Sequence, residues 1–342
     1  MGGAREGASP GAAAVPLVHR SRSLDPYENL ALEHELAARV RPGEHLLFLW
    51  RNERTVVIGR NQNAWAECDV RALGEDGGRL ARRQSGGGAV FHDAGNLNFT
   101  FASSRAEHDV SRNLDVVRRA VASFGLDARV TGRNDVTVDG AKFSGNAFFR
   151  SHGVQVHHGT LMVGVQVGQL ARYLKPDPRK LQAKGIASVR SRVVNLSSLD
   201  ERITVDALAG ALVDAFEQTM GARCEAFPAE RLDQGALAAA RDRFSSWEWR
   251  FGAVRPFTDT VEERFAWGGV EFRLNVVRGT VAGVQAYSDA LDAAFVERMA
   301  RALEGARYHA SSLAEALAGV PCEDDAHERM VEDCRALFEA RV

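Results

Sequence analysis

The amino-acid sequence predicts an α+β fold with two domains. Strand-like and helix-like segments follow one another in mixed order, which favours α+β over a doubly wound parallel sheet. The pattern also changes around SSWEWRFG, residues 245–252, beyond which we expect a strand meander and two helical stretches. With 342 residues, the chain is long enough for one large domain or two of ordinary size. We therefore predict a disordered tail over residues 1–16, a large domain over 17–246, a linker over 247–254 and a small α+β domain over 255–342.

The first predicted helix follows Asp25-Pro26. Aspartate caps helices well and proline suits a first helical turn, and the apolar residues that follow recur at helical spacing: Leu32, Leu36 and Val40. The apolar stretches LLFLW (46–50) and TVVIG (55–59) predict two buried strands. Because only the four residues 51–54 separate them, we expect these strands to form a hairpin.

Two further strands and a helix are expected around the first glycine-rich segment. GAVFH (88–92) predicts a short strand, and NLNFTF (96–101) alternates polar and apolar residues. The turn residues between them, Asp93-Ala94-Gly95, predict that the two strands pair. Residues 113–124 predict a helix that Asn113 caps and Gly125 ends.

The middle of the chain predicts a hairpin, a strand and a long helix. DVTVDGAKF indicates a hairpin about Asp139-Gly140, and Ser144-Gly145-Asn146 indicates a second tight turn after it. HHGTLMVGV (157–165) predicts a strand. Thr204 to Met220 predicts a helix that Thr204 caps and Gly221 ends.

Composition narrows the class of protein. The formal net charge is −2, so the whole molecule is not built to bind polyanions such as nucleic acid. The sequence holds no apolar run of 18 residues, so we expect no membrane span. The four cysteines form no CxxC pair and no metal-ligand spacing, which favours free thiols and a cytoplasmic location. A transit peptide at the start is the alternative, although the tail contains an acidic residue, Glu6.

The stretch RRQSGGGAVFHD, residues 82–93, is the first candidate site. Three consecutive glycines cost backbone entropy, so either a tight turn or a closely approaching ligand should require them. The segment lacks the GK[ST] ending of a P-loop and enters a strand rather than a helix, so helix-dipole binding of phosphate does not apply. Arg82 and Arg83 beside backbone N–H groups favour an anion such as phosphate.

Two more stretches carry candidate polar groups. GRNDVTVDGAKFSGNA places Asn134 and Asp135 before a lone lysine, Lys142. That lysine is either exposed and idle or a placed cation that faces a bound oxyanion. His157 and His158 are adjacent in a predicted strand, so their side chains should point to opposite faces and should not share a metal ion.

Residues 172–192 form a basic segment in a nearly neutral protein. They include seven Lys or Arg and one acid, Asp177, which gives a local charge of +6. A solvated loop, an acidic protein partner or a polyphosphate all fit this charge. Nucleic acid fits less well, because Tyr173 is the only aromatic residue there to stack on bases.

Taken together and in this order, these stretches resemble lipoate–protein ligase A. The matching text is LFLWRNERTVVIGRNQNAWAECD, RLARRQSGGGAVFHDAGNLNFTF, GRND, KFSGNA, HHGTL, KLQAKGIASVRSRVVNL and SSWEWRFG. The resemblance implies a biotin/lipoate ligase catalytic domain, similar to class II aminoacyl-tRNA synthetase cores, over residues 17–246. It also implies that lipoate and ATP, with Mg²⁺, give lipoyl-adenylate, whose lipoyl group passes to a lysine of a carrier domain.

The same resemblance assigns roles to individual residues. Lys142 would offset the charge that builds up as the lipoate carboxylate attacks the α-phosphate. Asp135 would hold Mg²⁺ or accept a proton from the incoming lysine. The nucleotide, its phosphates and the acyl ligand would be held by Lys142 together with Arg83, Ser85, Gly87, Gly88, Ala89, Val90, Phe91, His92, Asn134 and His158.

Partners and rivals follow from the resemblance as well. The expected partners are acidic lipoyl domains of 2-oxoacid dehydrogenase E2 subunits and the glycine-cleavage H protein. The basic segment 172–192 would either steer the docking of such a carrier or close over the adenylate. Because the C-terminal domain lies in the same chain, we expect activation and transfer without an accessory subunit, and we expect a monomer. The rivals are an octanoyltransferase with a cysteine nucleophile, a transferase that uses preformed lipoyl-adenylate, and a module that only binds lipoyl-adenylate or polyanions.

Overall fold

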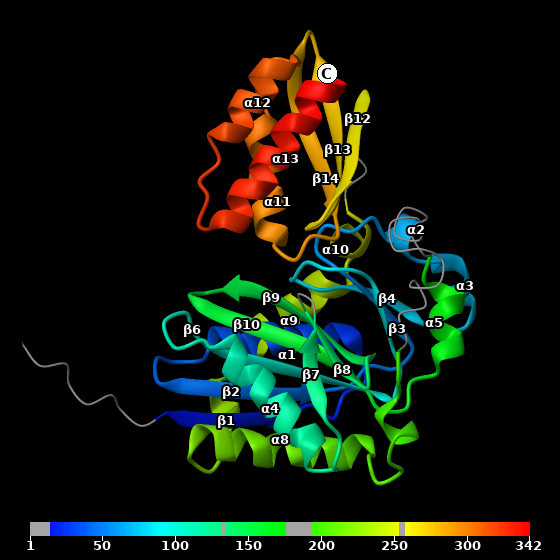
Figure 1. The fold of residues 1–342 in the computed structure, drawn as a ribbon, viewed down its shortest axis with the longest axis vertical. Coiled ribbons are helices and arrows are strands. Elements are labelled where there is room, and N and C mark those ends of the chain that lie inside the picture. Colours follow the sequence, from blue (N-terminus) through cyan, green and yellow to red (C-terminus); the bar gives the residue numbers. More distant parts are fainter. Residues whose placement is uncertain (1–13, 132–133, 176–192, 253–256) are drawn as a thin grey trace, which may run out of the picture.

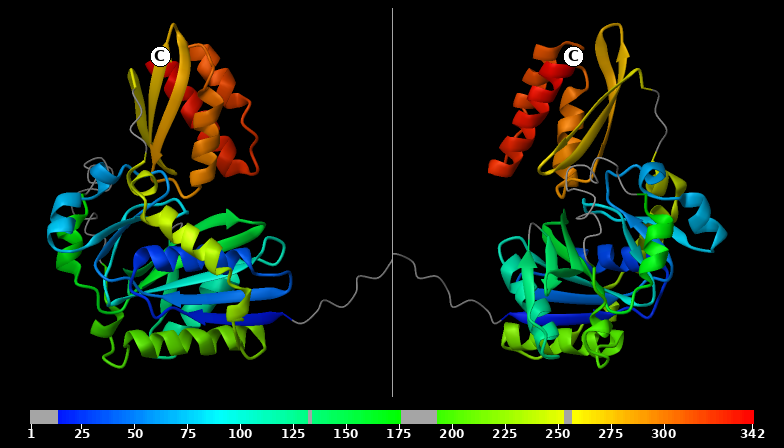
Figure 2. Two further views of the ribbon diagram at one scale, coloured as in Figure 1. Left: turned by 180° about the vertical axis from the view of Figure 1, so that it is seen from behind. Right: turned by 45° about the vertical axis from the view of Figure 1, so that its right-hand side comes forward.

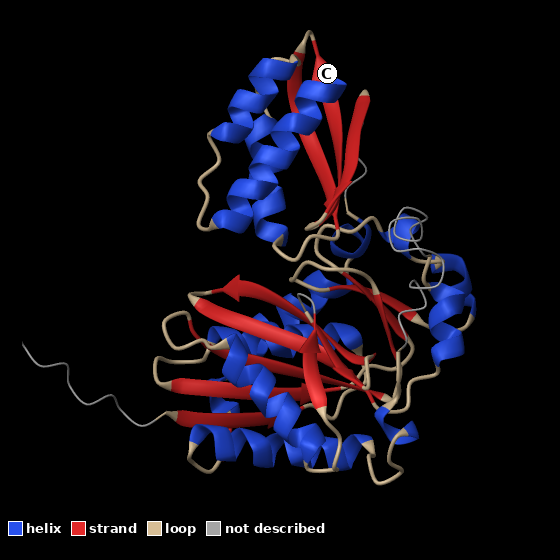
Figure 3. Ribbon diagram, viewed as in Figure 1, coloured by secondary structure: helices blue, strands red, loops and turns tan. Residues whose placement is uncertain are grey.

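The computed structural model describes residues 14–131, 134–175, 193–252 and 257–342. A large body with a long mixed sheet carries a smaller C-terminal unit of three strands and three helices (Figures 1 and 3). In both views of Figure 2, the C-terminal unit stands on the side of the large body opposite the long helix α8 (Val205–Met220). The predicted α+β class is confirmed.

The main sheet has eight strands. In spatial order they are β11 (Glu225–Ala226), β1 (Val15–Arg20), β2 (Glu44–Trp50), β6 (Asn96–Ser104), β10 (Val154–Met162), β9 (Ala141–Ser151), β8 (Asp135–Val138) and β7 (Ala128–Thr131). β11, β1 and β2 run parallel, and the other neighbouring pairs are antiparallel. Because β1 begins at Val15, the predicted tail over residues 1–16 is too long at its end; residues 1–13 lie outside the described part.

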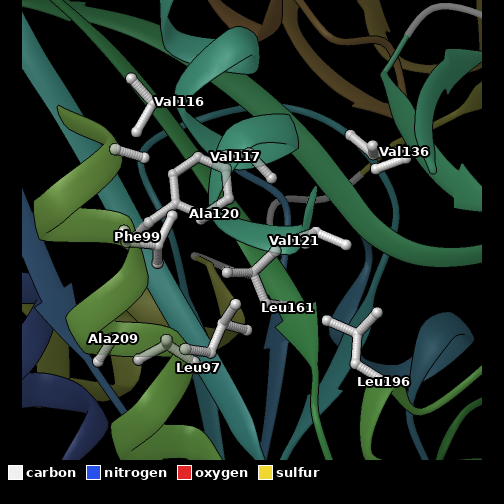
Figure 4. Packing of buried hydrophobic residues seen from close by; sticks show 14 of the residues in the cluster. Leu97, Phe99, Val116, Val117, Ala120, Val121, Val136, Leu161, Leu196 and Ala209 are labelled. Atoms are coloured by element: carbon white, nitrogen blue, oxygen red, sulfur yellow. The ribbon is translucent and has the colours of Figure 1, made fainter. Parts of the chain in front are cut away.

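Helices cover both faces of this sheet. α4 (Val110–Ala122) and α8 pack on one face, where Phe99 of β6 is fully buried against Val116 and Ala120 (Figure 4). α1 (Pro26–Ala38) and α9 (Gln234–Ser245) lie on the other face. Side chains alternate along a strand, so β6 sends its phenylalanines to the first face and Asn98 and Thr100 to the second.

Two of the three predicted helix caps are confirmed. The Asp25 carboxylate accepts hydrogen bonds from the backbone N–H groups of Tyr27 and Glu28 at the start of α1. Thr204 caps α8, and Gly221 ends it in the left-handed conformation at φ +69°. The expectation that Asn113 caps α4 is wrong, because the side chain of Asp109 accepts the N–H of Arg112 and starts the helix earlier.

Both strand pairings expected near the glycine-rich segment are wrong. β3 (Thr55–Ile58) pairs with β4 (Arg79–Arg82) and β5 (Val90–His92) in a separate three-stranded sheet, so neither the β2–β3 nor the β5–β6 hairpin forms. Residues 51–54 dock onto the start of α1: Asn29 Nδ2 donates to the Arg51 carbonyl at 2.7 Å. Because this contact with a sequence-distant residue holds residues 51–54 on α1, β3 does not return to pair with β2 in the main sheet. The short helices α2 (Ala64–Glu67) and α3 (Val70–Glu75) connect β3 to β4.

The predicted hairpin about Asp139-Gly140 is confirmed. Both turn residues have positive φ, +50° and +74°, as a two-residue hairpin with a type I′ turn requires. The second turn predicted at 144–146 is wrong, because β9 continues through these residues and Gly145 pairs with Asp135 of β8. The predicted strand at 157–165 is confirmed as β10, although it begins at Val154 and ends at Met162.

The remaining elements link the large body to the C-terminal unit or complete that unit. α5 (Val167–Tyr173), the short 3-10 helices η1 (Leu196–Ser198) and η2 (Ala229–Arg231), and α10 (Trp247–Phe251) belong to the large body. The predicted meander is confirmed as β12 (Asp259–Phe265), β13 (Gly268–Val277) and β14 (Thr280–Ser288). Three helices follow rather than the two expected stretches: α11 (Ala293–Leu303), α12 (Ala310–Ala318) and α13 (Asp325–Arg341).

In the described part of the chain, no helix combines the length and the apolar character that a bilayer crossing needs. All four cysteines belong to it, and each is a free thiol. Burial raises the pKa of the Cys68 and Cys334 thiols to about 12.

Candidate functional site

Arg82, at the end of β4, does not face a ligand site. Its guanidinium donates hydrogen bonds to backbone carbonyls of two segments far apart in sequence: Gly59, Arg60, Gln62, Trp249 and Arg250. Burial lowers its pKa to about 10. The expectation that Arg82 helps to bind an anion is therefore wrong, because backbone oxygens use its donors and fix the path of the chain.

Arg83 shapes the glycine-rich loop from inside. Its Nη2 donates to the carbonyls of Gly86 at 2.6 Å and Gly88 at 2.8 Å, and its Nε donates to Ser85 Oγ at 3.0 Å. Burial lowers the pKa of this guanidinium to about 10. Arg83 thus fixes the conformation of the loop. Arg83 and the loop residues Gly87 and Gly88 also form part of the wall of a pocket.

Close packing against another backbone segment requires glycine at two positions of this loop. A Cβ atom on Gly86 would lie 2.1 Å from the Ala290 carbonyl oxygen. Gly87 has φ +89°, and its N–H donates to the same oxygen at 2.9 Å. The C-terminal unit therefore docks directly on the loop, and two of the three glycines have structural reasons to be glycine.

One pocket of about 160 Å³ lies between two sheets. On one side is the second face of the main sheet, and on the other is the three-stranded sheet of β3, β4 and β5. Most of the predicted site residues line it: Arg83, Gly87, Gly88, Ala89, Val90, His92, Asn134, Lys142 and His158. Sequence reasoning did not single out the others in the wall, which are Trp50, Val57, Asn98, Gly145, Asn146, Ala147, Gly159 and Thr160.

Three predicted site residues lie behind the wall rather than in it. The Ser85 side chain lies between Arg83 and His158, with its Oγ 3.0 Å from Arg83 Nε and 2.7 Å from His158 Nε2. Phe91 points away from the pocket and packs on Tyr173, with 5.4 Å between ring centroids, because it alternates with Val90 and His92 along β5. Asp135 is not part of the pocket lining, but its Oδ1 forms an ion pair with Lys142, which is.

Lys142 projects from β9 at one end of the pocket. Its Nζ lies 2.6 Å from Asp135 Oδ1, and its side chain is 32% exposed. A Cβ atom on Gly145 would come within 3.3 Å of this Nζ, so the glycine leaves room for the ammonium group. The pocket therefore has a cation at its polar end that solvent and a ligand can reach.

A row of residues on four neighbouring strands of the main sheet runs from the opposite end of the pocket toward Lys142. Trp50 on β2 stands opposite Asn98 on β6, and Asn98 stands opposite Thr160 on β10. The N–H of Gly145 on β9 donates to Thr160 Oγ1 at 3.3 Å and completes the row next to Lys142. Trp50 and Lys142 thus mark the two ends of the pocket.

The two adjacent histidines point to opposite faces, as predicted. His157 is buried in the core, where its Nε2 lies 2.9 Å from Asn146 Oδ1 and burial holds its pKa well below the ordinary value. His158 faces the pocket, with Nδ1 2.8 Å from Glu33 Oε1 and Nε2 2.7 Å from Ser85 Oγ.

Glu33 is a buried acid that the sequence reading missed. Its Oε1 also accepts a hydrogen bond from Thr100 Oγ1 at 2.7 Å, and Thr100 Oγ1 in turn accepts the indole N–H of Trp50 at 3.1 Å. The signal was available, because Glu33 falls between Leu30 and Leu36 on the apolar face of α1. This network connects the apolar end of the pocket with His158.

The described residues offer no metal site of their own. No group of three or more His, Cys, Asp or Glu side chains with suitable spacing occurs among them. Asp135, the predicted magnesium ligand, has its Oδ1 engaged by Lys142. The described residues therefore do not fit a resident Mg²⁺.

The basic segment falls mostly outside the described residues, which resume at 193 after 175. Two of its seven Lys and Arg residues are described. Arg172 Nε lies 2.8 Å from Asp76 Oδ2, and Lys175 Nζ donates to the Trp65 carbonyl at 3.1 Å. Both side chains are engaged with the protein itself, so the predicted docking role of the segment stays a prediction.

Two family models and several solved structures match this chain. The model described as the lipoyl protein ligase A/B catalytic domain matches residues 25–217, and the model described as the bacterial lipoate protein ligase C-terminus matches residues 255–337. LipL1 of P. falciparum, solved in complex with lipoate, is 28% identical with a TM-score of 0.83; the match covers 95% of this chain and 100% of that chain.

Two further structures match a smaller share of this chain. The bi-partite lipoate protein ligase of Thermoplasma acidophilum, described with its E2 lipoyl domain, is 27% identical over 73% of this chain and 100% of that chain, with a TM-score of 0.61. A lipoate-protein ligase A bound with ATP is 25% identical over 71% of this chain and 100% of that chain, also with a TM-score of 0.61. Because the catalytic-domain model spans more than half of the sequence, this chain belongs to the lipoate–protein ligase family.

Proposed function

We propose that the protein activates free lipoate with ATP and transfers the lipoyl group to a lysine of a carrier domain. The observation that carries the proposal is the polarity of the pocket. Lys142 stands at one end, and Trp50, Val57 and Val90 contribute apolar surface beyond it. This arrangement suits a carboxylate with an apolar tail, and the similar LipL1 and lipoate-protein ligase A were solved with lipoate and ATP, respectively.

Lys142 would do the central chemistry. When the lipoate carboxylate attacks the α-phosphate of ATP, two anions approach one another and charge builds up between them. A preorganised ammonium group at that place stabilises the transition state more than the separated reactants. Because Lys142 is held by one carboxylate and remains partly exposed, it is free to engage incoming anions.

We assign Asp135 a positioning role. Its carboxylate holds Nζ of Lys142 at 2.6 Å across the β8–β9 hairpin. The two roles that the sequence suggested, magnesium ligation and proton acceptance, find no contact that supports them among the described residues. In this proposal Mg²⁺ enters with ATP, as the phosphate complex in which the ion usually binds.

The octanoyltransferase alternative is weaker than ligation. Such a transferase needs a cysteine nucleophile beside the acyl chain. All four cysteines lie in described parts of the chain and none lines the pocket, and burial raises the pKa of the Cys68 thiol to about 12. A transferase that accepts only preformed lipoyl-adenylate remains the alternative that experiment must separate.

The proposal extends to the partner. The similar Thermoplasma acidophilum ligase was described with its E2 lipoyl domain, which supports a lipoyl domain as the acceptor here. We further propose that the acceptor is acidic, that it includes E2 lipoyl domains and the H protein, and that the enzyme works as a cytoplasmic monomer.

Intact mass spectrometry of the carrier tests the proposal. The protein is incubated with lipoate, ATP, Mg²⁺ and an apo lipoyl domain. A carrier mass increase of one lipoyl group that depends on ATP supports ligation. A mass increase only with synthetic lipoyl-adenylate would replace ligation by transfer, and no increase in either case would refute both activities.

A further inference from the structure

Glu33 of α1 is a buried carboxylate that stands behind the wall of the pocket. It is 1% exposed, and it does not line the pocket itself. Its Oε1 lies 2.8 Å from His158 Nδ1 and 2.7 Å from Thr100 Oγ1. Its Oε2 has no hydrogen-bond partner among the described residues. Removing a carboxylate from water costs free energy, so its place on an apolar helix face requires an explanation.

Arg83 carries a buried positive charge that balances Glu33. Its guanidinium donates to one hydroxyl and three carbonyl groups, those of Ser85, Val57, Gly86 and Gly88. None of these acceptors is charged. Burial lowers the pKa of Arg83 to about 10, and the negative charge of Glu33 raises it against that effect. The guanidinium therefore stays protonated at neutral pH, and an ionised Glu33 compensates its charge within the protein.

The first arm of the network runs from Glu33 to Trp50. An ionised carboxylate can only accept hydrogen bonds, so the hydroxyl group of Thr100 gives its single proton to Glu33. The indole nitrogen of Trp50 can only donate, and it donates to Thr100 Oγ1 at 3.1 Å. Glu33 therefore determines how the Thr100 hydroxyl is turned, and that hydroxyl holds the indole of Trp50 at the apolar end of the pocket.

The second arm runs from Glu33 through His158 to the glycine-rich loop. Because Glu33 accepts, His158 Nδ1 must carry a proton. Arg83 Nε can only donate to Ser85 Oγ, so Ser85 keeps one proton to give. Its partner for that proton is His158 Nε2 at 2.7 Å, since the Gly86 carbonyl is farther away at 3.4 Å. The His158 ring is therefore neutral, with its proton on Nδ1 and an acceptor at Nε2.

Both arms include side chains that line the pocket. Trp50 lies on β2 and His158 lies on β10, and β6 runs between these two strands. Thr100 of β6 stands directly opposite His158. One acid from α1 thus fixes two parts of the wall that belong to different strands.

We propose that Glu33 is a positioning residue for lipoate. Through Thr100 it holds the indole of Trp50, and it holds the ring of His158 as the tautomer with the proton on Nδ1. This step rests on the proposed function, in which the acyl chain of lipoate lies beyond Lys142 toward Trp50. A wall that is ordered before the ligand arrives spares the ligand the cost of ordering it, which tightens binding. Glu33 therefore acts on the affinity for lipoate and not on the chemistry at Lys142.

Nitrogen-15 NMR of the full chain with labelled histidine tests the tautomer of His158. The resonances of His158 are those that disappear in His158→Asn. In the ligand-free wild-type protein at neutral pH we expect a proton on Nδ1 and none on Nε2, and in Glu33→Ala we expect this fixed pattern to be lost. A proton on Nε2 in the wild-type protein would by itself overturn the proposal, so the test stands even if Glu33→Ala does not fold.

The kinetics of ATP–pyrophosphate exchange test the effect on the substrate. In Glu33→Ala we expect the KM for lipoate to rise on the order of 10-fold, as the loss of about one hydrogen bond would cause, while kcat and the KM for ATP stay close to the wild-type values. Glu33→Gln keeps an oxygen that can accept from both Thr100 and His158, so it should recover part of the affinity. An unchanged KM for lipoate in Glu33→Ala, or a fall in kcat alone, would contradict a positioning role.

Glu35→Gln is the matched control on the same helix. Glu35 is also buried, at 5% exposure, but its carboxylate pairs with Arg39 Nη2 at 3.3 Å rather than with Thr100 or His158. This variant should keep the wild-type KM for lipoate and the wild-type tautomer of His158. An equal rise of the KM in Glu35→Gln would indicate a general effect of α1 and would remove the assignment to Glu33.

Carrier lipoylation by the wild-type protein, measured in parallel, separates this inference from the proposed function. ATP-dependent lipoylation together with a proton on His158 Nε2 would leave the function standing and remove the role of Glu33. A protein that neither binds lipoate nor attaches it to the carrier would remove both.

Discussion

Lys142 and Asp135 face each other across a two-residue hairpin, with 2.6 Å between Nζ and Oδ1. Their side chains are 32% and 37% exposed, and an ion pair in so much solvent contributes little to stability. The pair is better understood as a way to hold an ammonium group at the polar end of the pocket until an anion arrives. Its effects should therefore appear in catalysis rather than in folding.

Replacing Lys142 by alanine should lower kcat/KM for adenylate formation about 100-fold or more, by analogy with the loss of one oxyanion donor. Thermal unfolding should remain near that of the wild type, because the side chain is partly exposed. Pyrophosphate release with lipoate and ATP measures the rate. Arg129→Ala, at an exposed residue of β7, serves as a control for the loss of a cation.

Replacing Asp135 by asparagine should cost less, about 10-fold, since it removes the positioning of Lys142 and leaves the ammonium group. The double variant with Lys142→Ala should be no slower than Lys142→Ala alone, because the two residues act together. Losses that multiply in the double variant would indicate an independent role for Asp135, such as proton acceptance.

Replacing Gly86 by alanine should separate the loop from the C-terminal unit. The new Cβ would lie 2.1 Å from the Ala290 oxygen, and overpacking of this kind typically costs about 1–3 kcal/mol. Differential scanning calorimetry should show a lower unfolding temperature. Gly74→Ala is the matched control, because a Cβ there meets nothing within 4 Å. Equal unfolding temperatures of the two variants would argue against the packing seen at Gly86.

His92 should make the protein less stable at mildly acidic pH. Its pKa is lowered to about 3 in the fold, so between pH 6.5 and 3 the unfolded chain binds a proton that the folded chain does not. Stability is complete above pH 6.5 and falls by about 2 kcal/mol at pH 5 through this residue alone. Urea unfolding at pH 7 and pH 5 measures the difference, which should shrink in His92→Phe and persist in His309→Phe, at an exposed histidine of the C-terminal unit.

Several local features of the fold could be predicted from the sequence, although the cap at Asn113 and the turn at 144–146 were wrong, and the strand pairings near the glycine-rich segment could not be predicted. The caps at Asp25 and Thr204 and the turn at Asp139-Gly140 depend on neighbouring residues, and all three are confirmed. The separation of β3 from β2 depends on contacts that Asn29 makes across the chain. Nothing within residues 46–59 reveals those contacts.

The site residues likewise fall into two groups, those that the sequence indicated and those that it did not. Lys142, Arg83 and the glycine loop stood out because of their motifs, whereas Trp50 and Asn98 looked like ordinary strand residues. A signal for Asn98 did exist. β6 places Asn96, Asn98 and Thr100 on one face, and all three are buried, which is unusual for polar side chains that lack a ligand or a network.

The most direct measurement of the central claim is ATP–pyrophosphate exchange, which reports adenylate formation without any carrier. The account predicts that labelled pyrophosphate enters ATP in the wild-type protein only when free lipoate is present, and that Lys142→Ala removes most of this exchange. Exchange that is absent in the wild type, while the same protein transfers lipoate from synthetic lipoyl-adenylate, would contradict the claim that this pocket activates lipoate.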